Sequence, residues 1–120
     1  MAKKKVVGKS LESKSAAAGN RVFYSKWLDL AETRTLKARD GVLISYQTLG
    51  NGDETLVLAN GLGGRLYAWE PILDAFGDKY RIITWDYRGL FESGAPEKIR
   101  RLSIPDHAED VKEILDAEGI

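Results

Sequence analysis

Two apolar runs that each end in a glycine-containing turn constrain the fold most strongly. Residues 56–59 run into Asn60-Gly61-Leu62-Gly63-Gly64, and residues 80–85 run into Asp86-Tyr87-Arg88-Gly89. Near-continuous apolar runs of this length are typical of strands buried on both faces of a parallel sheet. Ligands bind at the carboxyl ends of such strands, where glycine lets the backbone approach closely. The sequence therefore predicts an α/β fold with a site at the ends of these two strands.

The segments around these runs complete the predicted architecture. Asp40-Gly41 lies between two alternating segments and indicates a β-hairpin. Pro71 fits the first turn of a helix that Gly77 ends, and Ser103 fits the N-cap of a last helix with Asp106 three residues later. We expect a hairpin followed by β-α-β-α, with strands over 33–38, 42–48, 55–60 and 80–85 and helices over about 69–76 and 103–118.

The amino-terminal segment differs in composition from the rest. Residues 1–21 hold six basic residues against one acidic residue, a net charge of +5 in a chain whose total is zero. Residues 1–20 are predicted to be a disordered basic tail, and 21–32 a short amphipathic helix with Phe23, Trp27 and Leu30 on one face. That helix packs on its own domain in one interpretation and tethers the chain to an anionic membrane in the other.

Composition excludes several classes of function. The chain has 120 residues, enough for at most one ordinary domain, and its hydrophobic fraction of 43% supports a core. It has no cysteine and one histidine, which rules out a disulfide framework, a cysteine nucleophile and histidine-rich metal sites. A cytoplasmic location agrees with this composition. No apolar run resembles a secretory signal, and the absence of aromatic residues from 1–20 argues against nucleic-acid binding.

The glycine-rich loop after the first buried strand does not fit the known phosphate-binding motifs. Position 66 is Leu66 where a dinucleotide fingerprint needs glycine, and Gly64 is followed by Arg65 where a phosphate loop needs lysine. The loop can still offer backbone N–H groups to an oxyanion. A tight strand-to-helix turn without a ligand explains the same spacing, and the spacing alone does not decide between the two.

Taken together, these motifs resemble the amino-terminal half of an α/β-hydrolase over residues 33–120. Asn60-Gly61-Leu62-Gly63-Gly64 is similar to the family's His-Gly-x-x-Gly, and the segment from Asp86 to Ser93 is similar to Asp-x-Arg-Gly-x-Gly-x-Ser. The resemblance implies an incomplete α/β-hydrolase sheet and hydrolysis of a small organic ester, amide, epoxide or similar substrate. It implies no cofactor and no metal. An incomplete sheet would also leave an edge strand exposed, which suggests self-association.

The resemblance also assigns roles to individual residues. It implies that the Leu62 N–H is one half of the oxyanion hole, and that Asn60 shapes the loop where the family usually has histidine. Phe91 stands where glycine is common. The residues expected to shape the two loops are Asn60, Gly61, Gly63, Gly64, Asp86, Arg88, Gly89 and Ser93.

The family's nucleophile motif, Gly-x-Ser-x-Gly, does not occur in the sequence. The only histidine, His107, is interpreted as a surface residue near a helix terminus, and Asp106, Glu109 and Asp110 as first-turn carboxylates. We therefore expect a fragment of a hydrolase that ends before the nucleophile and is inactive alone. The alternative is a non-catalytic module that associates through an exposed sheet edge.

Overall fold

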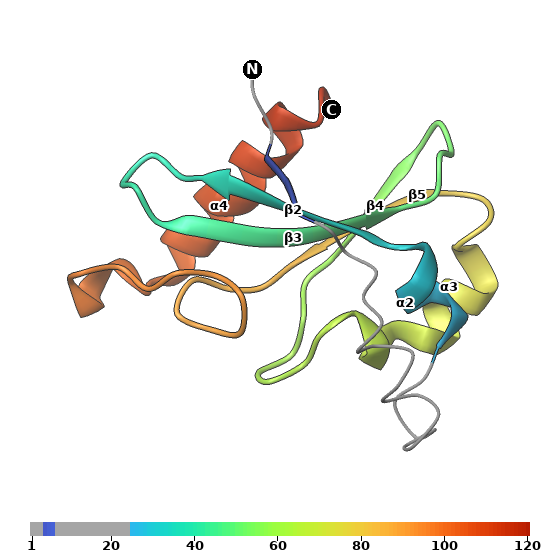
Figure 1. Ribbon diagram of the computed structural model, residues 1–120, viewed down its shortest axis with the longest axis horizontal. Helices are drawn as coiled ribbons and strands as arrows, with labels where there is room; N and C mark the ends of the chain where they lie inside the picture. The colour runs from blue at the N-terminus through green and yellow to red at the C-terminus, as the bar shows by residue number, and fades with distance from the viewer. Residues whose placement is uncertain (1–3, 7–24) are drawn as a thin grey trace.

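The computed structural model describes residues 4–6 and 25–120 and shows one mixed sheet with helices packed on it (Figure 1). The sheet order is β1-β2-β3-β5-β4. In chain order the elements are β1 (Lys4–Val6), α2 (Lys26–Leu30), β2 (Glu32–Lys37), β3 (Leu43–Leu49), β4 (Thr55–Leu58), the 3-10 turn η2 (Leu66–Trp69), α3 (Glu70–Phe76), β5 (Arg81–Trp85), the 3-10 turn η3 (Ile99–Arg101) and α4 (Ile104–Ala117).

The predicted α/β fold is confirmed. β2 and β3 form the expected hairpin, and β3 then pairs antiparallel with β5. β4 pairs parallel with β5, and α3 connects the two strands as a crossover. Because β4 and β5 run in the same direction, their carboxyl ends and the loops that follow lie at one edge of the sheet.

Side chains alternate across the sheet and fill a core on each face. Leu49 and Ile82 point to the face covered by α2 and α3, whereas Tyr46 and Ile83 point to the face covered by α4 (Figure 1). β5 therefore contributes to both cores, as its continuous apolar sequence predicts. The α4 helix begins at Ser103, whose side-chain oxygen accepts a hydrogen bond from the Asp106 N–H at 3.2 Å, so the predicted N-cap is confirmed.

The helix predicted over 21–32 ends earlier than expected, and residues 21–24 lie outside the described residues. α2 spans only Lys26–Leu30, and Glu32 already belongs to β2. Trp27 is buried and its indole N–H donates to Asp74 at 2.7 Å, whereas Leu30 points largely to solvent. A Cβ on Gly77, the C-cap of α3, would lie 2.5 Å from the Trp27 ring, so this glycine is needed for close packing.

The amino-terminal predictions lie mostly outside the described residues. Lys4–Val6 pair with β2 as strand β1, which differs from the disordered tail predicted over 1–20. The other residues of 1–20 and Phe23 are outside the described ranges, so their predicted disorder and membrane tethering stay predictions. Among the residues described, no helix is long and apolar enough to cross a membrane.

Candidate active-site loops

Asn60 fixes the loop after β4 through both ends of its side-chain amide. Its nitrogen donates to the Trp85 carbonyl at 2.8 Å, and its oxygen accepts the Trp69 indole N–H at 2.7 Å. The Asn60 carbonyl accepts the Tyr87 hydroxyl at 2.6 Å. This buried residue therefore ties the start of the loop to β5 and to η2, which supports the loop-shaping role expected for it.

The next four residues form a tight turn that projects Leu62 into solvent. The Gly64 N–H donates to the Gly61 carbonyl at 2.9 Å, and Gly63 has φ of +77°. A positive φ at the third position alone is the pattern of a type II turn, which favours glycine there. Leu62 is 94% exposed, and its N–H donates to no group in the described part of the chain. Gly61 has no positive φ, so only Gly63 requires glycine on conformational grounds.

Asp86 begins the second loop and pairs with the first. Its buried carboxylate accepts two hydrogen bonds from Arg65, at 3.1 Å from Nε and 2.9 Å from Nη2. The Glu92 N–H adds a third at 3.2 Å. Burial raises the pKa of the Asp86 carboxyl above its ordinary value, although the charge of Arg65 and the Glu92 N–H oppose that rise. Asp86 and Arg65 therefore hold the two loops against each other.

Ser93 and Gly89 fix the rest of the second loop. The Ser93 hydroxyl donates to the Asp86 carbonyl at 2.6 Å and accepts the Ser45 N–H at 2.8 Å, which fastens the loop to β3. Gly89 has φ of +85° and donates its N–H to the Gly94 carbonyl. Both residues lie where a role in shaping this loop is expected.

Phe91 adopts a backbone conformation that usually requires glycine. Its φ is +48°, the only positive φ at a non-glycine residue in the described chain. Its half-exposed ring lies under the Arg65 guanidinium, 4.9 Å from the ring centroid. The loop thus has a left-handed backbone at Phe91, and the ring adds a cation–π contact beside the first loop.

Arg88 lies in the turn after β5, and its side chain extends to α4 and to the turn between β2 and β3. The fully buried guanidinium donates to Asp110 on α4 at 2.8 Å through both Nε and Nη2, and to Asp40 in the hairpin turn at 2.7 Å. Asp110 is therefore a buried ion-pair partner that lies beyond the first turn of α4, and its interpretation as a first-turn carboxylate was wrong. Arg88 fastens α4 and the β2–β3 turn to the loop after β5.

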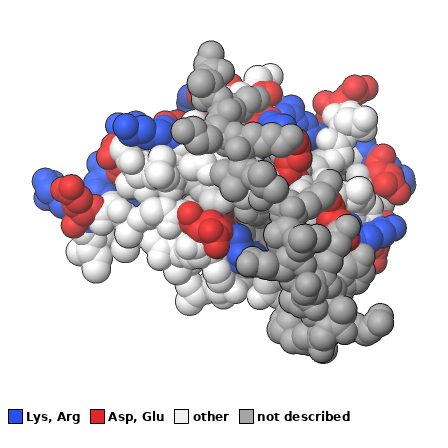
Figure 2. Space-filling view, in the orientation of Figure 1, with Lys and Arg blue, Asp and Glu red and all other residues white. Residues whose placement is uncertain are grey.

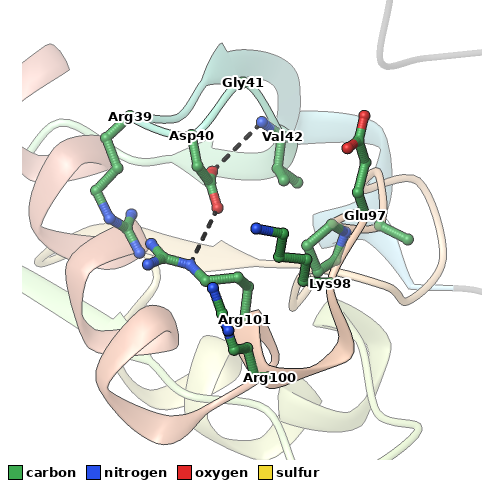
Figure 3. A pocket seen from close by; sticks show the side chains of 10 residues that line it. Arg39, Asp40, Gly41, Val42, Glu97, Lys98, Arg100 and Arg101 are labelled. Carbon is green, nitrogen blue, oxygen red and sulfur yellow. Dashed lines mark hydrogen bonds and ion pairs between the residues drawn. The ribbon is translucent and has the colours of Figure 1, made fainter.

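Further ion pairs extend this network to the surface. Asp40 lies beside Arg101 and accepts from the Val42 N–H (Figure 3). Arg39 contacts Asp106, Asp110 and Glu113 at 2.7–2.9 Å. Arg39 and Arg101 line a cavity of about 630 Å³ together with Lys98 and Arg100 (Figure 3).

His107 is half-buried rather than fully exposed. Its ring lies over Tyr87, with 4.8 Å between the ring centroids, and its Nδ1 has no hydrogen-bond partner. No serine of the candidate loops contacts it. The structure thus gives His107 a packing role against Tyr87 and does not bring it to Leu62.

Sequence reasoning missed three residues that organise the site: Arg65, Trp69 and Tyr87. Each one acts through a partner that is distant in sequence, 21 residues away for Arg65 and 27 residues away for Tyr87. A buried aspartate at the end of a strand needs a cation, and Arg65 in the facing loop was the available signal.

The described residues contain no cluster of three histidine, cysteine or acidic side chains suited to a metal. On the face in view, basic and acidic residues lie close together rather than in separate patches (Figure 2).

The model of the alpha/beta hydrolase fold family matches residues 54–120, which is more than half of the chain. The chain belongs to this family. It is 32% identical over 69 residues to a putative carbamate hydrolase, RutD, of Caulobacter segnis, and 40% identical over 63 residues to 3-oxoadipate enol-lactonase 2 of Acinetobacter baylyi. These matches cover 58% and 52% of this chain but only 26% and 23% of those relatives.

Solved structures show the same relationship. An epoxide hydrolase from Vigna radiata matches with a TM-score of 0.65 and 27% identity, over 77% of this chain and 30% of the other. Epoxide hydrolase A from Mycobacterium thermoresistibile matches with a TM-score of 0.65 and 31% identity, over 74% and 28%. The chain therefore spans about a quarter to a third of the proteins that it resembles.

Proposed function

We propose that this chain supplies the oxyanion-hole loop of an α/β-fold hydrolase acting on a small organic ester, amide, epoxide or similar substrate. In this proposal the Leu62 N–H is one donor to the developing oxyanion. The serine nucleophile and the catalytic acid and base are not among these 120 residues, and in this proposal they belong to a longer form of the protein. A cytoplasmic location fits the cysteine-free composition.

The observation that carries the proposal is the free N–H of Leu62 on a rigid turn. A useful oxyanion donor must be unpaired, accessible and fixed before the reaction. Leu62 is exposed, its N–H makes no hydrogen bond in the described structure, and Asn60 holds the turn at its base. The names of the relatives, which include a carbamate hydrolase, an enol-lactonase and epoxide hydrolases, support a small-molecule substrate.

An assay of two proteins tests this function. The 120-residue chain alone should show no turnover of activated aryl esters, because oxyanion stabilisation without a nucleophile leaves little catalysis. The chain extended through its downstream reading frame should contain Gly-x-Ser-x-Gly and turn over a small ester, amide or epoxide. An extension that lacks this motif and shows no turnover would contradict the proposal, as would activity of the short chain that His107→Ala abolishes.

A second function, self-association, is favoured by the open edge of β4. Within the described residues β4 pairs only with β5, so its other edge has no partner strand. The strand carries no charge, and Val57 is 38% exposed. An unguarded apolar edge is a template for pairing with another chain.

Light scattering at micromolar concentration tests self-association. We expect oligomers of the full chain, and we expect Val57→Lys to reduce them because a charge on an edge strand opposes pairing. Lys37→Ala, on the distant strand β2, is the control and should leave the oligomers unchanged. A monodisperse monomer that melts cooperatively would contradict this function.

A further inference from the structure

A second cavity lies on the α2 side of the sheet, away from Leu62. Its volume is about 250 Å³. That is roughly eight times the share of one water in the liquid, so a single water cannot fill it. Its walls combine apolar side chains with a few polar groups, and the lining residues are Leu28, Ala31, Thr33, Gln47, Arg65, Leu66 and Tyr67.

Gln47 is the unusual member of this lining. It is only 6% exposed, yet within the described part of the chain neither its side-chain nitrogen nor its side-chain oxygen has a hydrogen-bond partner. A buried polar group without a partner costs about 1–3 kcal/mol, and native proteins rarely leave both ends of an amide unpaired. A ligand that both donates a hydrogen bond to the Gln47 side-chain oxygen and accepts one from its nitrogen would remove this cost.

The neighbours of Gln47 in the sheet do not provide that partner. Thr33 and Thr84 lie directly opposite Gln47 on the two adjacent strands. The Thr84 hydroxyl is used by the Leu58 carbonyl at 2.8 Å. Ser45, two residues earlier on the same face of β3, also has an unpaired buried hydroxyl. This face of β3 thus carries two buried polar side chains, Ser45 and Gln47, that no described residue hydrogen-bonds.

The charge of the cavity narrows the class of ligand. Arg65 is the only charged residue of the lining, and its Nε and Nη2 are both bound by Asp86. The pair is close to neutral overall, so a charged ligand gains little here and would lose its hydration. A neutral molecule that carries an adjacent N–H and C=O matches the Gln47 amide in both directions.

We propose that this cavity binds a small neutral amide, such as a lactam or a primary carboxamide, with its N–H and C=O paired to the Gln47 side chain. The apolar remainder of the ligand lies against Leu28, Ala31 and Leu66. This inference does not depend on the proposed hydrolase function, because neither Leu62 nor Asn60 lines the cavity.

Gln47 is the only glutamine in the chain, which allows a selective test. Labelling glutamine side-chain nitrogen with ¹⁵N gives one pair of NH₂ signals that report Gln47 alone. The probe is 2-pyrrolidone, and the control is cyclopentanone, which has the same ring size and a C=O but no N–H. We expect 2-pyrrolidone to shift both signals saturably and to bind at least about tenfold more tightly than cyclopentanone.

A pair of variants completes the test through ligand-observed saturation transfer. Gln47→Met keeps the shape of the side chain and should weaken 2-pyrrolidone binding about tenfold or more. Thr35→Val, on the same face of the sheet but outside the cavity, should bind as the original chain does. If the Met variant fails to fold, the labelled original chain decides alone.

Three results would overturn the proposal. One is the absence of any saturable shift, as expected if ordered water fills the cavity. Another is equal affinity for 2-pyrrolidone and cyclopentanone, which would show that Gln47 does not accept a hydrogen bond from the N–H of the ligand. The third is unchanged affinity in a folded Gln47→Met variant.

Discussion

Arg65 and Asp86 form a two-point ion pair that joins the loops at the ends of β4 and β5. The guanidinium donates from Nε at 3.1 Å and from Nη2 at 2.9 Å to the two carboxylate oxygens. The aspartate side chain has no exposed surface, whereas the arginine side chain is about one-third exposed. Breaking such a pair from one side leaves a buried charge without compensation.

Arg65→Ala should therefore destabilise the fold by about 2–4 kcal/mol in the free energy of unfolding. Asp86→Asn in the same chain should recover part of this loss, because the uncompensated charge is then gone. Lys112→Ala is the matched control, since it removes the exposed ion pair with Asp116 on α4 and should change stability little. Urea unfolding measures all three, and equal losses for Arg65→Ala and Lys112→Ala would contradict the role given to the pair.

Asp40→Asn should change how stability depends on pH. The hydrogen bond from Arg88 lowers the pKa of the Asp40 carboxyl from 3.8 to about 2. A lowered pKa in the folded state stabilises the protein above the ordinary pKa, and this stabilisation is lost as pH falls from about 4 to about 2. Asp40 lies near solvent, so we expect a contribution of about 1 kcal/mol.

Melting curves between pH 2 and pH 6 measure this effect. The Asn variant should be less stable than the original chain at pH 6, and the difference should shrink toward pH 2. A constant difference across this range would show that ionisation of Asp40 does not stabilise the fold.

At position 91 we expect the glycine variant to be more stable than the alanine variant, the opposite of the usual order of stability. At φ of +48° alanine keeps the strain of the left-handed region and loses the ring contact with Arg65. Glycine loses the same contact but relieves the strain, so Phe91→Gly should be more stable than Phe91→Ala by about 1 kcal/mol. Thermal melting decides the order, and a more stable alanine variant would mean that this φ costs nothing.

Gly63 and Gly61 should respond differently to alanine. Neither position has a neighbour within 4 Å of an added Cβ, so backbone conformation alone separates them. Gly63→Ala forces a side chain into φ of +77° and should cost about 1 kcal/mol, whereas Gly61→Ala should cost little or stabilise slightly. Similar melting temperatures for the two variants would argue against the type II turn.

The sequence predicted those elements whose signals are local. The buried runs gave β4 and β5 to within two residues, and Ser103 marked the start of α4 because capping needs only nearby residues. The helix over 21–32 was predicted to end too late, since the same apolar spacing also fits the start of a strand. Strand β2 takes Glu32 because it pairs with Thr48, a partner that periodicity cannot reveal.

The residues of the candidate site differ in the same respect: some have a local sequence signal, and others depend on contacts that only the fold creates. Asn60 and the glycines were found because a strand end followed by small residues is a local pattern. The roles of Asp110 and Arg65 were missed because they depend on which loops the fold brings together, with Arg88 and Asp86 as their partners. Charge and spacing alone could not separate a buried ion-pair partner from a carboxylate in the first turn of a helix.

The most direct measurement compares Leu62→Pro with Leu62→Ala in the chain extended through its downstream reading frame. Proline suits the second position of a type II turn, so it removes the N–H without changing the backbone, and alanine keeps the N–H. We predict that Leu62→Pro lowers kcat by about 100-fold or more, while Leu62→Ala stays within about threefold of the parent, at equal melting temperatures. Equal kcat for the two variants would contradict the assignment of the Leu62 N–H to the oxyanion hole.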